Sequence, residues 1–267
     1  MVQDGRVVST QPLEDLRIFV VTIPSSMKSG LIVITCAVMF LALIGCTRGD
    51  SGGVDGSSGN PTGEAHTRIK PGPITYVALG DSTGVGVGAH GGGYVSRLVN
   101  RLKPLRPNSK LVNLCFSGAT TEDVVRSQLN EGVSEVPDLI TLGIGINDIG
   151  HGISLSQFAK NYEEILNTLK SKTAAVIVVT NIPDISTAPR IPVAVRNEYQ
   201  QRIVRFNETL ETIASAHGVL LVDIHSLTRE KLPSHPEFFS ADGFHPSDQG
   251  YELWADQMWP TIAEVLE

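Results

Sequence analysis

The chain has 267 residues, of which 41% are hydrophobic and 18% are charged, as in an ordinary globular domain with appendages. Its net charge is −7, and no run of Lys or Arg is longer than two residues. Phosphate binding needs clustered bases, so this pattern excludes nucleic acid as an expected partner. The cysteines at positions 36, 46 and 115 lack the spacing of metal sites, so we expect no metal, no cofactor and no disulfide.

An apolar segment near the N-terminus predicts export. Residues 31–44 are uncharged and mostly apolar, and they follow Lys28. A membrane span needs about 20 such residues, so this segment has instead the length of a signal-peptide core. Its end, Leu43-Ile44-Gly45-Cys46, resembles the lipobox of bacterial lipoproteins. That resemblance implies a signal peptide over residues 27–45, acylation of Cys46, and a lipid-anchored location in the bacterial cell envelope, outside the cytoplasm. The alternative is an uncleaved signal anchor.

The segments on either side of this signal differ in composition. Residues 1–26 carry mixed charge, and we expect them to be a non-native leader upstream of a true start at Met27. Residues 46–72 are rich in Gly, Ser, Pro and Asp, which is typical of a flexible linker. The folded domain is therefore expected over residues 73–267.

Within this domain, apolar runs alternate with helical periodicity. The expected strands cover residues 74–80, 110–115, 138–146, 175–181 and 219–224, and the expected helices 94–105, 124–129, 158–169, 195–213 and 247–266. Ser154 and Ser247 are expected N-caps, and Gly218 a C-terminal cap. Strands this continuously apolar are covered on both faces, so the pattern predicts an α/β fold: a three-layer α/β/α sandwich around a parallel five-stranded sheet.

Parallel sheets place their ligand sites at the carboxyl ends of the strands. Gly80-Asp81-Ser82 follows the first expected strand, and the segment 113–120 with Ser117-Gly118 follows the second. Asn147-Asp148 ends the third, and Asp242-Gly243-Phe244-His245 precedes the last helix. The fold therefore predicts that a serine, a glycine backbone, an amide and an acid–histidine pair meet at one edge.

This set of groups is the one that acyl transfer by serine requires. Ser82 can attack a carbonyl, His245 can take its proton, and Asp242 can orient His245. The backbone N–H groups of Ser82 and Gly118 and the side-chain amide of Asn147 can form an oxyanion hole. Glycine suits position 118 because it has no Cβ to obstruct the substrate oxygen.

Two acids next to these groups are given supporting roles. We expect Asp81 to brace the turn around Ser82 through backbone hydrogen bonds. We expect Asp148 to cap or orient the loop of Asn147.

The four blocks resemble those of the SGNH (GDSL-type) serine hydrolases, in their order and over residues 74–262. The resemblance implies a flavodoxin-like fold with strand order 2-1-3-4-5. It implies that Ser82 is the nucleophile, Asp242 and His245 complete a catalytic triad, and Ser82, Gly118 and Asn147 form the oxyanion hole. One departure is Thr83, where the family name expects leucine; we interpret it as a change of packing that bears on specificity at most.

Other motifs fit less well. Gly80-Asp81-Ser82-Thr83-Gly84 also matches the nucleophile elbow of α/β-hydrolases, but that fold has several strands before the elbow. The glycines at 84 and 86 mimic a dinucleotide fingerprint, yet they lie past the strand end and lack an acidic partner for a ribose.

The sequence predicts an ester hydrolase acting through an acyl-enzyme, and it leaves the substrate open. A short-chain or acetyl ester, a lysophospholipid and a thioester are all compatible with the groups. An O-acyltransferase or deacetylase of envelope glycans, and an inactive glycan-binding module, are the alternatives. Residues 83–93 and 182–197 are expected to shape the pocket, and nothing in the sequence decides the oligomeric state.

Overall fold

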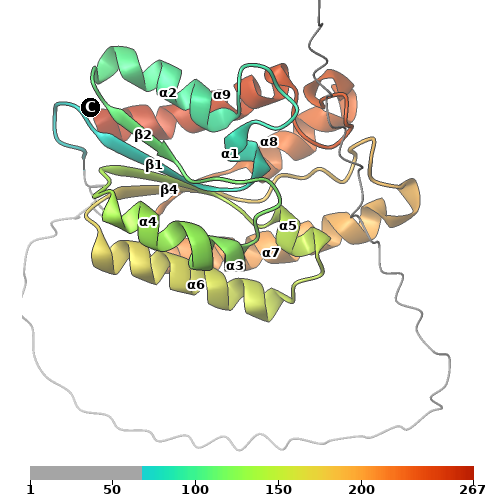
Figure 1. The fold of residues 1–267 in the computed structure, drawn as a ribbon. Coiled ribbons are helices and arrows are strands. Elements are labelled where there is room, and N and C mark those ends of the chain that lie inside the picture. The colour runs from blue at the N-terminus through green and yellow to red at the C-terminus, as the bar shows by residue number, and fades with distance from the viewer. Residues whose placement is uncertain (1–67) are drawn as a thin grey trace, which may run out of the picture. The chain divides into compact units, whose positions relative to one another are not determined.

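The structure is a computed structural model that describes residues 68–267 (Figure 1). The expected leader, the signal peptide, Cys46 and nearly all of the linker lie outside the described residues. Among the described residues, Ile69 is already part of the fold: it is 7% exposed, and its N–H donates to Val265 O at 2.8 Å. None of the helices in this part of the chain is both long and apolar enough to cross a membrane.

The five strands form one parallel sheet in the order β2-β1-β3-β4-β5. They are β1 (Thr75–Gly80), β2 (Lys110–Asn113), β3 (Leu139–Gly143), β4 (Val176–Thr180) and β5 (Leu220–Val222). This order confirms the expected flavodoxin-like fold. The central strands carry apolar residues on both faces because both faces are covered: Val77, Ala78 and Leu79 of β1 are all fully buried.

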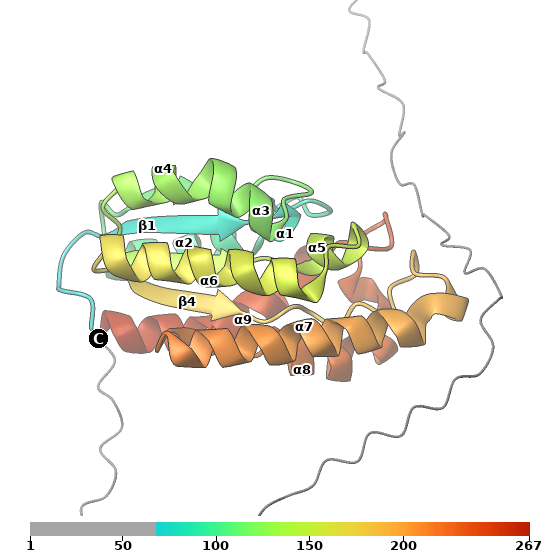
Figure 2. The same cartoon turned by 90° about the horizontal axis from the view of Figure 1, so that it is seen from below.

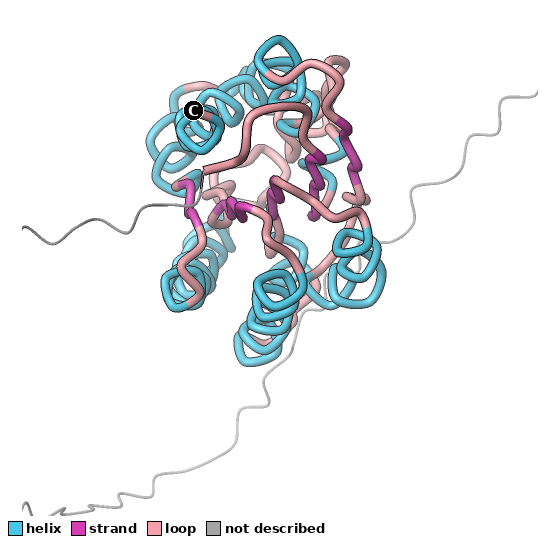
Figure 3. The backbone as a smooth tube through the Cα atoms, turned by 90° about the vertical axis from the view of Figure 1, so that its left-hand side faces the viewer, coloured by secondary structure: helices cyan, strands magenta, loops and turns pink. Residues whose placement is uncertain are grey.

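Helices cover the sheet in two layers (Figures 1 and 2). The elements are α1 (Ser82–Val85), α2 (Tyr94–Leu105), α3 (Thr121–Asp123), α4 (Leu129–Ser134), α5 (Ile146–Gly150), α6 (Leu155–Lys172), α7 (Arg196–Ala216), α8 (Ile224–Lys231) and α9 (Asp248–Leu266). Helices α2 and α9 pack on one face, and α4, α6 and α7 pack on the other. Figure 3, along the strands, shows the sheet between the two layers.

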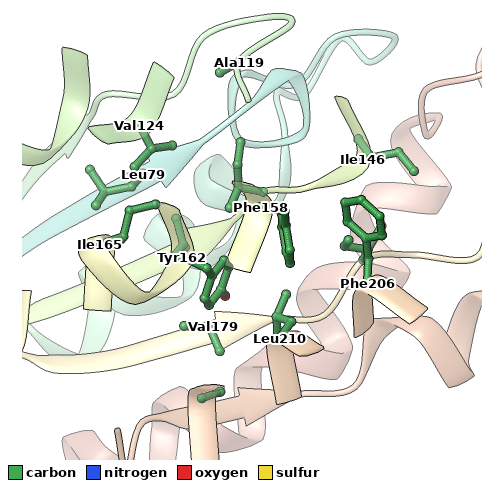
Figure 4. Close-up of a cluster of buried hydrophobic side chains, with 14 of the residues drawn as sticks. Leu79, Ala119, Val124, Ile146, Phe158, Tyr162, Ile165, Val179, Phe206 and Leu210 are labelled. Atoms are coloured by element: carbon green, nitrogen blue, oxygen red, sulfur yellow. The ribbon is translucent and has the colours of Figure 1, made fainter. Parts of the chain in front are cut away.

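Alternate residues of each strand supply the two cores. Tyr76 and Ala78 of β1 face α2 and α9, whereas Val77 and Leu79 face the other layer. Figure 4 shows this second core, in which Phe158 and Tyr162 of α6 meet α7 over the end of β4. The ring centroids of Phe158 and Phe206 are 4.8 Å apart, a tilted aromatic pair of the kind that contributes about 0.5–1.5 kcal/mol beyond burial.

The expected caps are confirmed. Ser154 Oγ accepts a hydrogen bond from Gln157 N at 3.2 Å, and Ser247 Oγ accepts one from Gly250 N at 3.2 Å. Gly218 follows the last turn of α7 with a φ of +59°, a conformation that favours glycine after a helix C-terminus.

All five strands are shorter than predicted, and the short helices α1, α3, α5 and α8 lie outside the predicted helices. β2 ends at Asn113 rather than 115, and β3 ends at Gly143 rather than 146. The alternation of Ile144 and Ile146 suggests a longer strand, but Gly145 has a φ of +127° and begins α5. Asn147 therefore lies in the first turn of a short helix. Similarly, β5 ends at Val222, two residues earlier than expected, and α8 begins at Ile224.

Candidate active site

The first element of the site is the turn that joins β1 to α1, here called the serine turn (residues 80–85). Asp81 caps α1, and its Oδ1 accepts hydrogen bonds from Thr83 N at 2.9 Å and Thr83 Oγ1 at 2.8 Å. The expectation that Asp81 braces this turn is confirmed. The interpretation of Thr83 as a packing change is wrong, because its hydroxyl is half of that brace. Burial raises the pKa of Asp81 to about 6, against the opposing effect of the two bonds from Thr83.

The serine turn is packed too tightly for side chains at its glycines. Gly80 has a φ of +151°, and a Cβ there would overlap the carbonyl oxygen of Gly143. A Cβ at Gly84 would overlap the sulfur of Cys115. Cys115 was expected in a strand, but it lies beyond β2, where its thiol fills the space under the turn; burial raises its pKa far above the ordinary value. Ser82, at the start of α1, is only 5% exposed.

The second element is the histidine loop (residues 240–246), which precedes α9. His245 Nε2 lies 3.0 Å from Ser82 Oγ, and His245 Nδ1 lies 2.6 Å from Asp242 Oδ2. A carboxylate can only accept, so Nδ1–H donates to Asp242 and Nε2 is left to accept the hydroxyl proton of Ser82. The structure thus brings together the three residues that the sequence predicted for this constellation.

Asp242 is held in place by the histidine loop itself. Its Oδ1 accepts from Ser240 Oγ at 2.8 Å, Phe244 N at 2.8 Å and His245 N at 2.9 Å. Partial burial would raise the pKa of Asp242, but the hydrogen bonds from His245, Phe244 and Ser240 outweigh that effect and hold the pKa well below its usual range. Asp242 is therefore ionised at neutral pH, as a partner for a protonated histidine must be.

The third element brings Gly118 and Asn147 together. Asn147 Nδ2 donates to Ala119 O at 2.9 Å, so the amide is tied to the residue next to Gly118 and keeps one N–H free for a ligand. Gly118 has a φ of +81°, and a Cβ there would meet no protein atom within 4 Å. The positive φ of Gly118 is thus a second reason for glycine at this position. The first, given by the sequence, is that no Cβ obstructs the substrate oxygen.

Asp148 links the segment of Asn147 to Thr121 at the start of α3. Its carboxylate accepts from Thr121 N at 3.0 Å and from the Thr121 hydroxyl at 2.5 Å. Asn161 Nδ2 in turn donates to Thr121 Oγ1 at 3.0 Å. Asp148 therefore joins α5 to α3 and so orients the Asn147 segment against the Gly118 segment, which confirms its expected role. Burial raises its pKa in spite of these bonds.

The two segments expected to shape the pocket both contact the histidine loop. Arg190 N donates to Gly243 O at 2.9 Å, which attaches residues 182–197 to that loop. On the other side, a Cβ at Gly88 would overlap Ser240, so residues 83–93 also pack against it. Residues 83–93 are also held by Asp248 of α9, whose carboxylate accepts hydrogen bonds from His90 N at 3.1 Å and Gly91 N at 2.8 Å.

Several supporting residues had no recognisable pattern in the sequence. Thr83 and Ser240 donate to acids two residues away, and Thr121 and Gln128 bond to segments far away in the sequence. These bonds depend on side-chain rotamers and on packing, so only the structure reveals them. Within residues 68–267, no three His, Cys, Asp or Glu side chains gather in a way that could hold a metal ion.

Chemically, the arrangement can generate a serine alkoxide and stabilise the charge that develops on its target. The hydroxyl, imidazole and carboxylate form one hydrogen-bonded chain at the C-terminal end of β1. The helix dipole of so short an element as α1 adds little, so the donors near Ser82 must come from individual N–H groups. An ester-like carbonyl is the electrophile that these groups suit.

Comparison with known proteins agrees with this geometry. Residues 78–253 match the GDSL-like lipase/acylhydrolase family. A GDSL-like esterase of Mycobacterium tuberculosis is 28% identical over 74% of this chain, and the match spans 65% of that relative's length. An acetylxylan esterase of Geobacillus stearothermophilus is 25% identical over 63% of this chain and 80% of its own.

The fold is shared with solved structures of the same kind. A lipase/acylhydrolase from Enterococcus faecalis superposes with a TM-score of 0.59 at 25% identity, covering 73% of this chain and 97% of that protein. The family match includes Ser82, Asn147 and His245. The chain belongs to the GDSL-like lipase/acylhydrolase family, a family of carboxylic ester hydrolases.

Proposed function

We propose that the protein is a serine ester hydrolase in which Ser82 is the nucleophile, His245 the general base and Asp242 its orienting partner. The observation that carries the proposal is the hydrogen-bonded chain from Ser82 Oγ through His245 to Asp242, with distances of 3.0 and 2.6 Å. Its members come from opposite ends of the domain, 163 residues apart for Ser82 and His245, which makes a chance alignment a poor explanation.

The reaction proceeds in two halves. Ser82 Oγ attacks the ester carbonyl carbon while His245 Nε2 takes the hydroxyl proton, and the carbonyl oxygen becomes an oxyanion. Donors for that oxyanion are the N–H groups of Ser82 and Gly118 and the free N–H of Asn147. Collapse expels the alcohol, which receives the proton from His245, and leaves the acyl group on Ser82. Water, deprotonated by His245, then releases the acid and restores Ser82.

The acetyl ester of a glycan is the substrate class we favour within this function. The relative from Geobacillus stearothermophilus is named as an acetylxylan esterase and covers 63% of this chain. Short-chain alkyl esters, lysophospholipids and thioesters are the other candidates, and an acceptor sugar in place of water would make the enzyme an O-acyltransferase. Hydrolysis of p-nitrophenyl esters of increasing chain length, run beside acetylated glycans, separates these possibilities.

The decisive experiment replaces the nucleophile. Ser82→Ala is expected to lower kcat for p-nitrophenyl acetate by at least about 10⁴-fold, because the remaining groups can only bind and polarise the ester. A wild-type protein that turns over no ester or thioester would favour the inactive glycan-binding module. A Ser82→Ala variant with wild-type turnover would assign the chemistry to another residue.

We also propose that acylation of Cys46 anchors the enzyme outside the cytoplasm, on the lipobox resemblance of residues 43–46. More than one acyl chain on that residue gives stable anchoring, since each buried CH₂ contributes about 0.8 kcal/mol. Cys46→Ala is expected to abolish incorporation of labelled fatty acid and to release the protein from the membrane fraction. Labelling that survives the substitution contradicts the anchor.

A further inference from the structure

Strand β1 extends beyond its neighbour β2 just before the serine turn begins. The register pairs β1 with β2 only as far as Ala78 with Asn113, whereas β1 pairs with β3 up to Gly80 with Gly143. On the β2 side, the N–H and C=O of Gly80 therefore lie past the end of the ladder. Buried backbone groups of this kind need partners.

The side chain of Gln128 supplies those partners. Gly80 N donates to Gln128 Oε1 at 2.8 Å, and Gln128 Nε2 donates to Gly80 O at 2.8 Å. A primary amide carries a C=O and an N–H in one plane, as a peptide unit does, so Gln128 takes the place of the missing strand residue. Phe116 N adds a longer bond to Gly80 O at 3.4 Å, and Gln128 itself is 1% exposed.

The backbone around Gln128 is unusual in a way that suits this contact. Residues Val124–Gln128 form a turn of π-helix between α3 and α4, closed by a bond from Leu129 N to Val124 O. Single π turns inside helices are frequent at functional sites. Here the wider turn ends on Gln128, the residue whose amide holds Gly80.

We propose that Gln128 is a positioning residue for the reaction: its amide holds both polar backbone groups of Gly80 and so fixes Ser82 Oγ within reach of His245 Nε2. Only Asp81 separates Gly80 from Ser82, and Gly80, which has no Cβ and a φ of +151°, has more backbone freedom than another residue would have, so that its position depends on such a hold. The inference rests on the proposed role of Ser82 as nucleophile. It places the effect of Gln128 on kcat rather than on substrate binding.

The chain offers a matched control in the same layer of helices, on α7. Asn207 of α7 is 3% exposed, and its amide makes the same pair of bonds to Ile182, which follows β4. Ile182 N donates to Asn207 Oδ1 at 2.7 Å, and Asn207 Nδ2 donates to Ile182 O at 2.9 Å. This second amide clamp holds the start of residues 182–197 and no reacting group, so it reports what the loss of such a clamp costs when the nucleophile is not involved.

The experiment compares Gln128→Met with Asn207→Leu in the full chain. For each variant we measure Tm, kcat and KM for p-nitrophenyl acetate, and the rate at which a fluorophosphonate labels Ser82. Both variants are expected to lose Tm. Only Gln128→Met is expected to lose kcat and labelling rate, by about tenfold or more with KM within about twofold, because small displacements of a nucleophile are costly.

Gln128→Glu provides the conservative variant and covers the case in which Gln128→Met does not fold. Burial favours the protonated carboxyl, which still donates and accepts as the amide does. Its labelling rate is expected to match wild type near pH 6 and to fall below wild type as the pH rises, once an ionised carboxylate faces Gly80 O.

The outcomes separate this inference from the proposed function. A Gln128→Met variant that keeps kcat, as Asn207→Leu is expected to, overturns the positioning role and leaves that of Ser82 intact. A Gln128→Glu rate that stays in constant ratio to wild type at every pH overturns it as well. Failure of the wild-type protein to hydrolyse any ester would instead remove the proposed function itself.

Discussion

The serine turn and the histidine loop contribute the two ends of one hydrogen bond, yet they are built in opposite ways. The serine turn is buried and fixed by long-range contacts: Gly80 to Gln128 and Gly143, and Gly84 to Cys115. The histidine loop is more exposed, and its main bonds run between neighbours, from Asp242 to Ser240, Phe244 and His245. The comparison teaches that the nucleophile is positioned by the fold and the base by its own loop.

Local construction of the histidine loop implies that its residues can be changed without unfolding the domain. His245→Gln is expected to lower kcat by about 10⁴-fold or more, because within residues 68–267 only His245 forms a hydrogen bond with Ser82 Oγ. Tm is expected to change little, and the measurement is a paired assay of p-nitrophenyl acetate turnover and thermal unfolding. His151→Gln, in an exposed histidine just after α5, is the control and is expected to keep wild-type turnover. A large loss of Tm in His245→Gln contradicts the contrast between the two regions.

Because the serine turn is held by contacts with distant segments, substitutions there are expected to lower the stability of the domain. Gly80→Ala is expected to destabilise the protein by about 3 kcal/mol or more, because the new Cβ overlaps Gly143 O and the φ of +151° is unfavourable for alanine. Chemical denaturation measures the loss. The control is Gly152→Ala, at a loop glycine of φ +74° whose Cβ would meet nothing within 4 Å; it is expected to cost only the strain of the backbone. Equal costs at the two positions would show that packing around Gly80 is loose.

The acids of the two regions are expected to respond to pH with opposite signs. The pKa of Asp242 is lowered in the fold, so Asp242 adds stability at pH values above its unfolded pKa and loses it as the pH falls through its folded pKa. The pKa of Asp81 is raised from 3.8 to about 6, so Asp81 removes stability as the pH rises between those two values.

Asp81→Asn tests this difference. The variant is expected to gain stability relative to wild type between pH 4 and pH 7, by about 2 kcal/mol, because it no longer carries a buried charge. Asp242→Asn is expected to be less stable than wild type by a nearly constant amount over the same series, because Asp242 is ionised at all of these pH values and loses its contribution only at lower pH. Unfolding curves at several pH values give both differences. Parallel trends for the two variants would contradict the opposite pKa shifts of the two carboxyls.

The sequence was enough to predict the fold and the three residues of the hydrogen-bonded chain. Continuous apolar strands imply a covered parallel sheet, and its carboxyl edge collects whatever follows each strand, so Ser82, Gly118 and Asn147 could be grouped before any coordinates. Asp242 and His245 are close in the sequence, so their contact could be predicted without knowing how distant segments pack. Element boundaries were harder, since Ile144 and Ile146 alternate like a strand although Gly145 turns the chain.

Side-chain contacts that depend on rotamers and packing could not be predicted. The bond from Thr83 to Asp81 needs one rotamer of Thr83, and the amide of Gln128 reaches Gly80, 48 residues away in the sequence, from the end of a π turn. Nothing in the sequence around Thr83 or Gln128 indicates which group each side chain will contact. The supporting residues of a site are, for this reason, the part that sequence patterns describe least well.

The glycines of residues 83–93 have a consequence for how this enzyme can diversify. Gly86 and Gly93 lie backbone against backbone, so that a Cβ at either one would overlap the other's main chain, and a Cβ at Gly88 would overlap Ser240. These positions accept no larger side chain, and the segment cannot acquire new pocket-lining groups there by point mutation. Residues 182–197 include exposed positions such as Val193, at 78% exposure, and touch the same histidine loop through Arg190. A new substrate preference, in nature or in a mutant library, is therefore expected to arise from substitutions in residues 182–197 or at exposed non-glycine positions such as Val85, rather than at these glycines.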